Sequence, residues 1–182
     1  MTDTPITLAE AKAQCRITDT SEDTLVAAYI NAARDYIENT TGIVCGTATR
    51  VLRYDMFAER LPIYRAPLIS ITSVSYVASD GTETTLAADQ YRVRERHGVA
   101  TLQPAYGVTW PDTECVDGAV TVTVSVGYAS NAATPDALRV AALMLVAHWY
   151  DNRGAVVIGS TTKAIELSVA ELLQHYRLEV IA

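Results

Sequence analysis

The sequence is short of cysteine, of basic side chains and of long apolar runs, and each shortage argues against a class of protein. Its 3 cysteines stand far apart without CxxC pairing, which disfavours a disulfide framework and a zinc site and favours a reducing compartment. The 14 lysines and arginines are outnumbered by 21 carboxylates, for a net charge of -7. A dedicated nucleic-acid-binding protein needs a basic face to displace counterions, although an acidic channel wall that DNA slides past is compatible with this charge.

Signals for a membrane or for export are also missing. No apolar run reaches the roughly 18 to 20 residues of a membrane span. The N-terminal stretch MTDTPITLAEAKAQ lacks a basic region followed by an apolar core. We therefore expect no signal peptide and no membrane contact.

The motifs that usually carry chemistry are absent as well. The sequence has no G-x-S-x-G, Walker A, GxGxxG or HExxH pattern. The histidines His97, His148 and His175 fall in a predicted turn, a central helix and the last helix. On the central helix, His148 has a carboxylate three residues on, Asp151, but no third ligand is apparent. We expect neither an enzyme nor a bound metal or cofactor.

The longest apolar-periodic run, residues 134–153, predicts a central helix. The chain length of 182 residues suits one domain or one domain with an insertion. Thr134 is expected to cap this helix, with Pro135 at its first position and Gly154 beyond its end. Apolar side chains surround nearly the whole helix. This pattern is typical of a helix covered by neighbours or by another subunit.

Three further helices are predicted. Residues 7–15 begin with a capping box, in which Thr7 caps and Glu10 stands three positions later, and residues 21–41 end at Gly42. The last helix spans about 168–177, with Ser168 as its cap and Glu171 as the box partner. Residues 154–166 lack a clear periodic signal, and a connection of this length is usually mobile or functional.

Between residues 45 and 128 the apolar pattern alternates, which predicts strands. The clearest is Val120–Val126, whose valines alternate with threonine and serine, and turns at Asp80-Gly81 and His97-Gly98 predict hairpins. The predicted fold class is therefore α+β: a helical bundle formed by residues 1–44 and 129–182, with an inserted antiparallel β-rich segment at 45–128.

A stripe of three arginines, Arg92, Arg94 and Arg96, occupies alternate positions of one predicted strand and so shares one face. It can pair with local carboxylates such as Glu83, Glu95 or Asp89, or with another subunit, or it can meet phosphate. The chain also has 10 tyrosines against 1 phenylalanine, and tyrosine is favoured where one end of the side chain is wet, as at subunit interfaces.

Five stretches, in this order, resemble the head–tail connector (adaptor) proteins of tailed bacteriophages: LAEAKAQCRI, EDTLVAAYINAARDYIENTTG, PLISITSVSY, VGYASNAATPDALRVAALMLVAHWYDNR and VAELLQHYR. The likeness spans nearly the whole chain and is closest to the subgroup with a β-rich insertion, which includes DNA-packaging-associated proteins of phages and gene transfer agents. Members often have a proline before the last helix, where this chain has Ser168.

The resemblance implies a structural protein that forms a ring, usually dodecameric, beneath the portal. Such a ring extends the DNA channel, contacts passing DNA and provides the platform for head-closure and tail proteins. The protein would lie at the head–tail interface of the virion, and in the host cytoplasm before assembly. By the same analogy we hypothesise that residues 154–166 and 178–182 order on the portal. We expect the helical bundle to supply the contact faces, with these candidate residues: Tyr29, Tyr36, Trp149, Tyr150, Arg153, Tyr176 and Arg177.

Three other interpretations stay open at this point. A tail-completion or head-closure protein belongs to the same class and differs in its partner. A DNA-binding module would rest on Arg92, Arg94 and Arg96 and would need a salt-sensitive affinity for duplex DNA. A small enzyme would rest on His97 or His148, which fall in different predicted elements.

Overall fold

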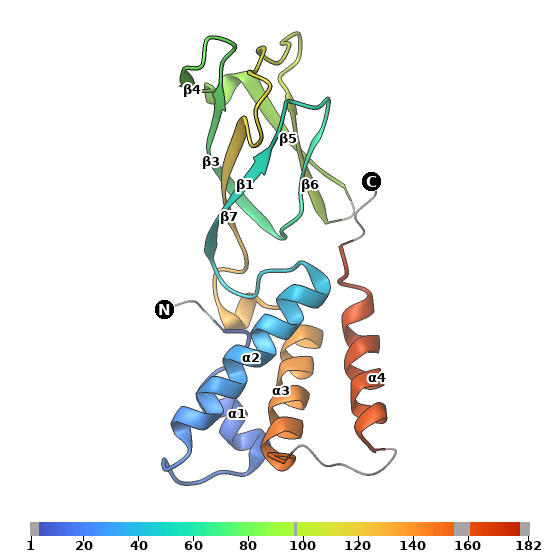
Figure 1. Ribbon diagram of the computed structural model, residues 1–182. Coiled ribbons are helices and arrows are strands. Elements are labelled where there is room, and N and C mark those ends of the chain that lie inside the picture. The colour runs from blue at the N-terminus through green and yellow to red at the C-terminus, as the bar shows by residue number, and fades with distance from the viewer. Residues whose placement is uncertain (1–3, 97, 155–160, 179–182) are drawn as a thin grey trace. The chain divides into compact units, whose positions relative to one another are not determined.

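The computed structural model describes residues 4–96, 98–154 and 161–178, with side chains described outside 161–166. The chain divides into two compact units (Figure 1). One, here the helical unit, is drawn from residues 1–46 and 128–179, and the other, the β unit, contains residues 47–127. Helices and antiparallel sheets together confirm the predicted α+β class. Among the described residues, no helix is long and apolar enough to cross a membrane.

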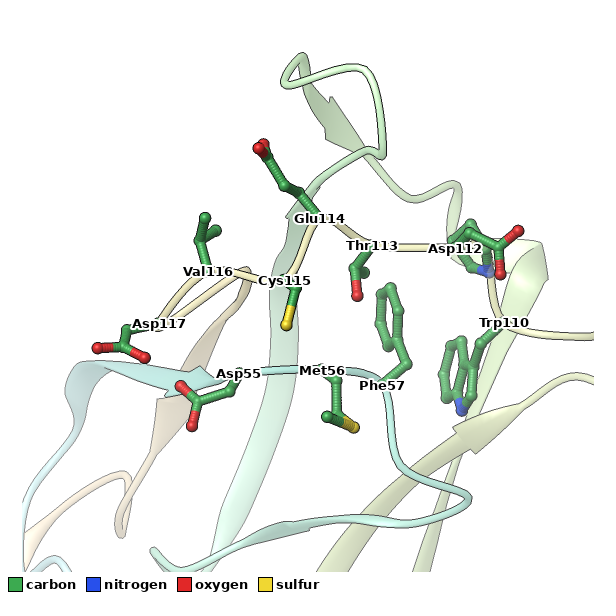
Figure 2. Close-up of a pocket in the computed structure, with 11 residues that line it drawn as sticks. Asp55, Met56, Phe57, Trp110, Asp112, Thr113, Glu114, Cys115, Val116 and Asp117 are labelled. Atoms are coloured by element: carbon green, nitrogen blue, oxygen red, sulfur yellow. The ribbon is translucent and has the colours of Figure 1, made fainter.

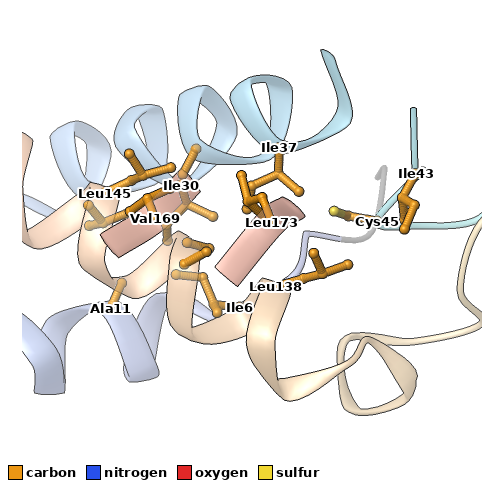
Figure 3. Packing of buried hydrophobic residues seen from close by; sticks show 14 of the residues in the cluster. Ile6, Ala11, Ile30, Ile37, Ile43, Cys45, Leu138, Leu145, Val169 and Leu173 are labelled. Carbon is orange, nitrogen blue, oxygen red and sulfur yellow. The ribbon is translucent and has the colours of Figure 1, made fainter. Parts of the chain in front are cut away.

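The helical unit is organised around α3, as the apolar pattern of the sequence predicts. Helix α3 packs against each of the other three helices. Its buried side chains include Leu138, Leu145 and Val146, and the other helices contribute Ile37 and Leu173 to the same cluster (Figure 3). The helices are α1 (Leu8–Cys15), α2 (Asp23–Thr41), α3 (Asp136–Asp151) and α4 (Thr161–Gln174).

Two local signals place the helix ends where the sequence predicts them. The capping box of α1 is formed: the Thr7 side chain accepts from the Glu10 N–H, and the Glu10 carboxylate accepts from the Thr7 N–H at 2.7 Å. Helix α2 ends at Gly42, which has φ +79°. A Cβ at this position would lie 3.0 Å from Leu178 Cδ1, so both the backbone conformation and the close approach favour glycine.

The predicted cap of α3 is wrong. Thr134 is buried, and its hydroxyl donates toward the carbonyl oxygens of Cys45, at 3.3 Å, and Ser130, at 3.4 Å. The helix begins at Asp136, and Pro135 stands at the N-cap without a side-chain hydrogen bond. A buried hydroxyl needs a partner, and here the distant Cys45 carbonyl competes successfully with the first turn of the helix.

The predicted start of the last helix is also wrong. Helix α4 begins at Thr161, so Ser168 is a mid-helix residue and its capping box with Glu171 is not formed. Strong helix formers precede Ser168, and they extend the helix toward the N-terminus because burial of Val169 and Leu173 anchors its other half. Residues 155–160 of the predicted connection lie outside the described residues.

The β unit contains two antiparallel sheets. In the first, β7 lies between β1 and β3, and its four valines are buried in strict alternation, as predicted. Register shifts along β3 mark the irregularity where its sequence pattern slips. The hairpin at Asp80-Gly81 pairs β3 with β4, and the next two strands, β5 and β6, also pair antiparallel. The first sheet has the order β1 (Ala48–Tyr54), β7 (Val120–Val126), β3 (Leu68–Val77), β4 (Glu83–Thr85), and the second has β2 (Leu61–Ile63), β6 (Val99–Pro104), β5 (Tyr91–Arg96).

Candidate interaction surfaces

Three residues form a polar cluster where α2 begins and α3 ends. Arg153 Nη1 lies 2.6 Å from Glu22 Oε1, and the Tyr150 hydroxyl donates to the other oxygen of the same carboxylate. The guanidinium carbon of Arg153 also stands 4.4 Å from the centroid of the Tyr150 ring, a cation–π arrangement. Tyr150 and Arg153, both predicted as partner contacts, are therefore engaged with Glu22 inside the subunit.

The contacts in this cluster favour an ionised Glu22, a protonated Tyr150 hydroxyl and a charged Arg153. The hydrogen bond from Arg153, followed by that from Tyr150, lowers the pKa of Glu22. The same contacts raise the pKa of Tyr150 and that of Arg153. The cluster is a charge-assisted link between the start of α2 and the end of α3.

Glu22→Gln is expected to flatten the loss of stability in acid. The folded-state pKa of Glu22 is depressed, so its contribution is fully present above the unfolded pKa and is lost as the pH falls through the folded value. Urea unfolding from pH 6 down to pH 3, in steps of about half a unit, measures this. Glu171→Gln, at an exposed position of α4, is the control. Superimposable acid profiles for Glu22→Gln and the wild type would contradict the assignment.

The other candidate contact residues differ in how far their side chains are buried. Tyr29 and Trp149 are half-buried against the helical core, with ring centroids 6.4 Å apart and an angle of 50° between the ring planes. Tyr176 also packs against that core. Tyr36, by contrast, is 42% exposed on α2, and Arg177 is exposed after α4. Tyr36 and Arg177 are thus the members of the predicted set that are most available to a partner.

Of the three histidines, the structure describes His148 and His175. His148 is half-buried on α3, and the Asn152 side chain lies 3.2 Å from its Nδ1. His175 is exposed, and His97 lies outside the described residues. Within residues 4–96, 98–154 and 161–178, no group of three or more His, Cys, Asp or Glu residues is placed to hold a metal ion.

The three arginines Arg92, Arg94 and Arg96, here called the arginine stripe, are all exposed on β5. Among the described strands, β5 is an edge of its sheet and has β6 as its one neighbour. The local ion pairs that the sequence left open, to Glu83, Glu95 or Asp89, are not formed in the described part of the chain. The stripe therefore presents three guanidinium groups on an exposed sheet edge.

A shallow pocket of about 420 Å³ lies in the β unit between the segment after β1 and residues 110–117, here called the acidic loop (Figure 2). Phe57 and Trp110 are among its lining residues and stack with ring centroids 4.6 Å apart, and Trp110 Nε1 donates to the Ala58 carbonyl at 2.8 Å. At the rim, Asp55 accepts from the Gly118 N–H at 2.8 Å. This pocket is not among the features predicted from the sequence, although the three carboxylates in WPDTECVD, after Trp110-Pro111, are a recognisable signal.

The three cysteines are expected to differ widely in reactivity toward a thiol reagent. Cys115 is exposed in the acidic loop, whereas Cys45 is buried and burial raises its pKa to about 12. Because the thiolate is the reactive form, the native protein should show one fast thiol, and Cys45 should react only on unfolding. A disulfide-exchange dye measures the phases. Cys115→Ser should remove the fast phase; its persistence in that variant, or rapid modification of native Cys45, would contradict the structure.

Comparison with known protein families then decides the assignment, because a family model described as "Head completion protein" matches residues 4–178. The chain belongs to the head completion protein family. The match includes both units, so the β unit is part of the family pattern. The connector family that the sequence resembles is thereby confirmed at this level.

Solved structures with the same fold as this head completion family member come from gene transfer agent (GTA) particles. A chain from the neck of an empty GTA particle computed with C6 symmetry has a TM-score of 0.77 at 22% identity, over 98% of this chain and 92% of that one. A chain from the neck of a native GTA particle computed with C12 symmetry has a TM-score of 0.71 at 20% identity, over 100% and 97%. No curated protein sequence matches the chain. At these identities the likeness shows the fold.

Proposed function

We propose that this protein is a structural head–tail connector subunit of a phage-like particle, without catalytic activity. The observation that carries the proposal is the family match across residues 4–178. The fold likeness over nearly the full length of chains from GTA necks supports it. In the subunit, the apolar α3 is covered by three helices, and charged side chains are exposed on the β unit. This arrangement suits a component of an assembly better than a substrate-binding protein.

In this proposal the subunits form a closed ring, dodecameric as in the resembling family, at the head–tail interface of the virion. The ring docks under the portal, continues the DNA channel and offers its lower face to head-closure and tail proteins. Support comes from the C6 and C12 symmetries of the similar neck structures, since both belong to closed rings. The net charge of -7 suits a channel along which DNA passes without strong binding.

Particle assembly without this protein tests the proposal. Particles made in cells that lack it should accumulate heads separated from tails, and the protein supplied from a plasmid should restore joined particles. Electron microscopy of purified particles counts both forms. Normal tailed particles in its absence would refute the proposed function.

A head-closure role is a second candidate, favoured by the description of the matching family as head completion proteins. The two roles differ in the partner above the ring. A connector should bind the isolated portal directly, whereas a head-closure protein should bind only after a connector ring is present. Co-sedimentation with the portal alone separates these roles.

A further inference from the structure

We propose that the arginine stripe of one subunit docks on the acidic loop of a second copy of this chain, so that adjacent subunits meet through two different patches of their β units. This inference rests on the proposed ring function and names the contact that would close the ring. A cyclic ring needs a heterologous interface, in which two different patches of one chain fit each other. The β unit carries two such patches with opposite charge.

Among the described residues of its own subunit, the arginine stripe has no ion-pair partner. Its guanidinium groups are exposed and form no ion pair within the described residues. The residues opposite it on β6 are uncharged, because Arg92, Arg94 and Arg96 pair in register with Gln103, Thr101 and Val99. Unpaired cations along an edge strand discourage unspecific strand pairing and leave the edge to a partner of opposite charge.

The acidic loop supplies that opposite charge on a fixed backbone. Thr113 forms a β-bridge with Ala78, and the Glu114 N–H donates to the Val77 carbonyl at 3.0 Å, so the segment is extended along the end of β3. Thr113 and Cys115 point toward the pocket and Glu114 points away from it (Figure 2). Asp112, Glu114 and Asp117 are exposed and form no ion pair within the part of the chain that is described.

The two patches match in spacing as well as in sign. Alternate residues of an extended chain lie roughly 6.5 to 7 Å apart, which applies to Arg92 and Arg94 on β5 and to Asp112 and Glu114 in the loop. Single exposed ion pairs are weak, but an array in register selects one partner and one orientation. Duplex DNA would meet the stripe equally well and would leave the acidic loop without a role, so the second copy explains both patches.

Charge exchange between the patches tests the contact. The stripe variant is Arg92→Glu/Arg94→Glu, the loop variant is Asp112→Arg/Glu114→Arg, and the exchanged variant carries all four substitutions. The control Arg16→Glu reverses one exposed arginine that follows α1 in the helical unit, outside both patches. Light scattering over a concentration series, alone and with the portal, gives the concentration at half-assembly. Circular dichroism checks that every variant is folded.

We expect the stripe variant and the loop variant each to need on the order of tenfold more protein for half-assembly, and the exchanged variant to return close to the wild type. An equimolar mixture of the stripe and loop variants should also assemble, because each restores the other's missing partner. The control should assemble as the wild type does.

The opposite outcomes separate two failures. Normal rings from both the stripe variant and the loop variant would overturn this contact and leave the ring function intact. Loss of assembly that the exchanged variant does not recover would also overturn it. A stripe variant that assembles normally but loses salt-sensitive binding of duplex DNA would assign the stripe to DNA. A wild type that never assembles, alone or on the portal, would overturn the proposed function itself.

Discussion

Leu138→Ala is expected to lower the free energy of unfolding by about 2 to 5 kcal/mol, because Leu138 is fully buried on α3 at the centre of the helical unit. The truncation removes apolar contacts and leaves a cavity that the neighbouring helices fill only in part. A domain is stable by only about 5 to 15 kcal/mol, so the substitution consumes a large share of that stability. Urea unfolding followed by circular dichroism at 222 nm measures the change.

Val140→Ala is the control for this prediction. Val140 stands on the same helix, two residues further on, and is 45% exposed. Truncating this partly solvated side chain should therefore change stability by no more than about 0.5 kcal/mol. Equal losses for Leu138→Ala and Val140→Ala would show that α3 is not the buried centre of the helical unit.

Val120→Asp is expected to cost at least about 3 kcal/mol, since it places a carboxylate without a cationic partner in the core of the β unit. Val120 is fully buried on β7, between Tyr54 of β1 and Tyr76 of β3 in the strand register. The backbone of β7 bonds to both neighbours, so the side chain has little room to turn toward water. Urea unfolding, with tryptophan fluorescence reporting on Trp110 and Trp149, measures the loss.

Val51→Asp provides the contrast. Val51 lies on the edge strand β1 opposite Thr123 and is 56% exposed, so its carboxylate stays hydrated. We expect a loss of less than about 1 kcal/mol, most of it from the lower strand propensity of aspartate. A severe loss for Val51→Asp together with a mild one for Val120→Asp would show that the buried and exposed faces of the first sheet are assigned the wrong way round.

Local sequence signals predicted those elements whose ends depend on neighbouring residues. The capping box of Thr7 and Glu10, the glycine stop at Gly42 and the alternation of Val120–Val126 are all short-range patterns, and the structure contains each of them. In these cases propensity, patterning and tertiary packing favour the same conformation, which is the condition under which sequence reasoning works.

The wrong predictions concern residues whose partners are distant in the chain. Thr134 has a good capping residue type, but its hydroxyl is used by the carbonyl of Cys45, which no local pattern reveals. Ser168 followed by Glu171 reads as a capping box, yet a helix that began earlier simply continues through both residues. The same local sequence can surround a serine at an N-cap or a serine within a helix, and tertiary packing decides which of the two forms.

The interaction residues were predictable in type but not in pairing. Amphipathic and cationic side chains suit interfaces, which favours Tyr150 and Arg153 as contacts. The structure joins both to Glu22, more than a hundred residues away in sequence. The arginine stripe was predictable because its spacing alone places it on one strand face. The acidic loop needed the structure, because only its bridge to β3 shows how the carboxylates are presented.

The mass of the protein in solution, measured by light scattering alone and after addition of the portal protein, tests the central claim most directly. The connector account predicts a closed ring, formed either by the protein itself or on the portal as a template. Which of the two occurs distinguishes self-assembly from templated assembly. A monomer that neither assembles alone nor binds the portal would contradict the account, and low-salt binding of duplex DNA by that monomer would place the arginine stripe on nucleic acid instead.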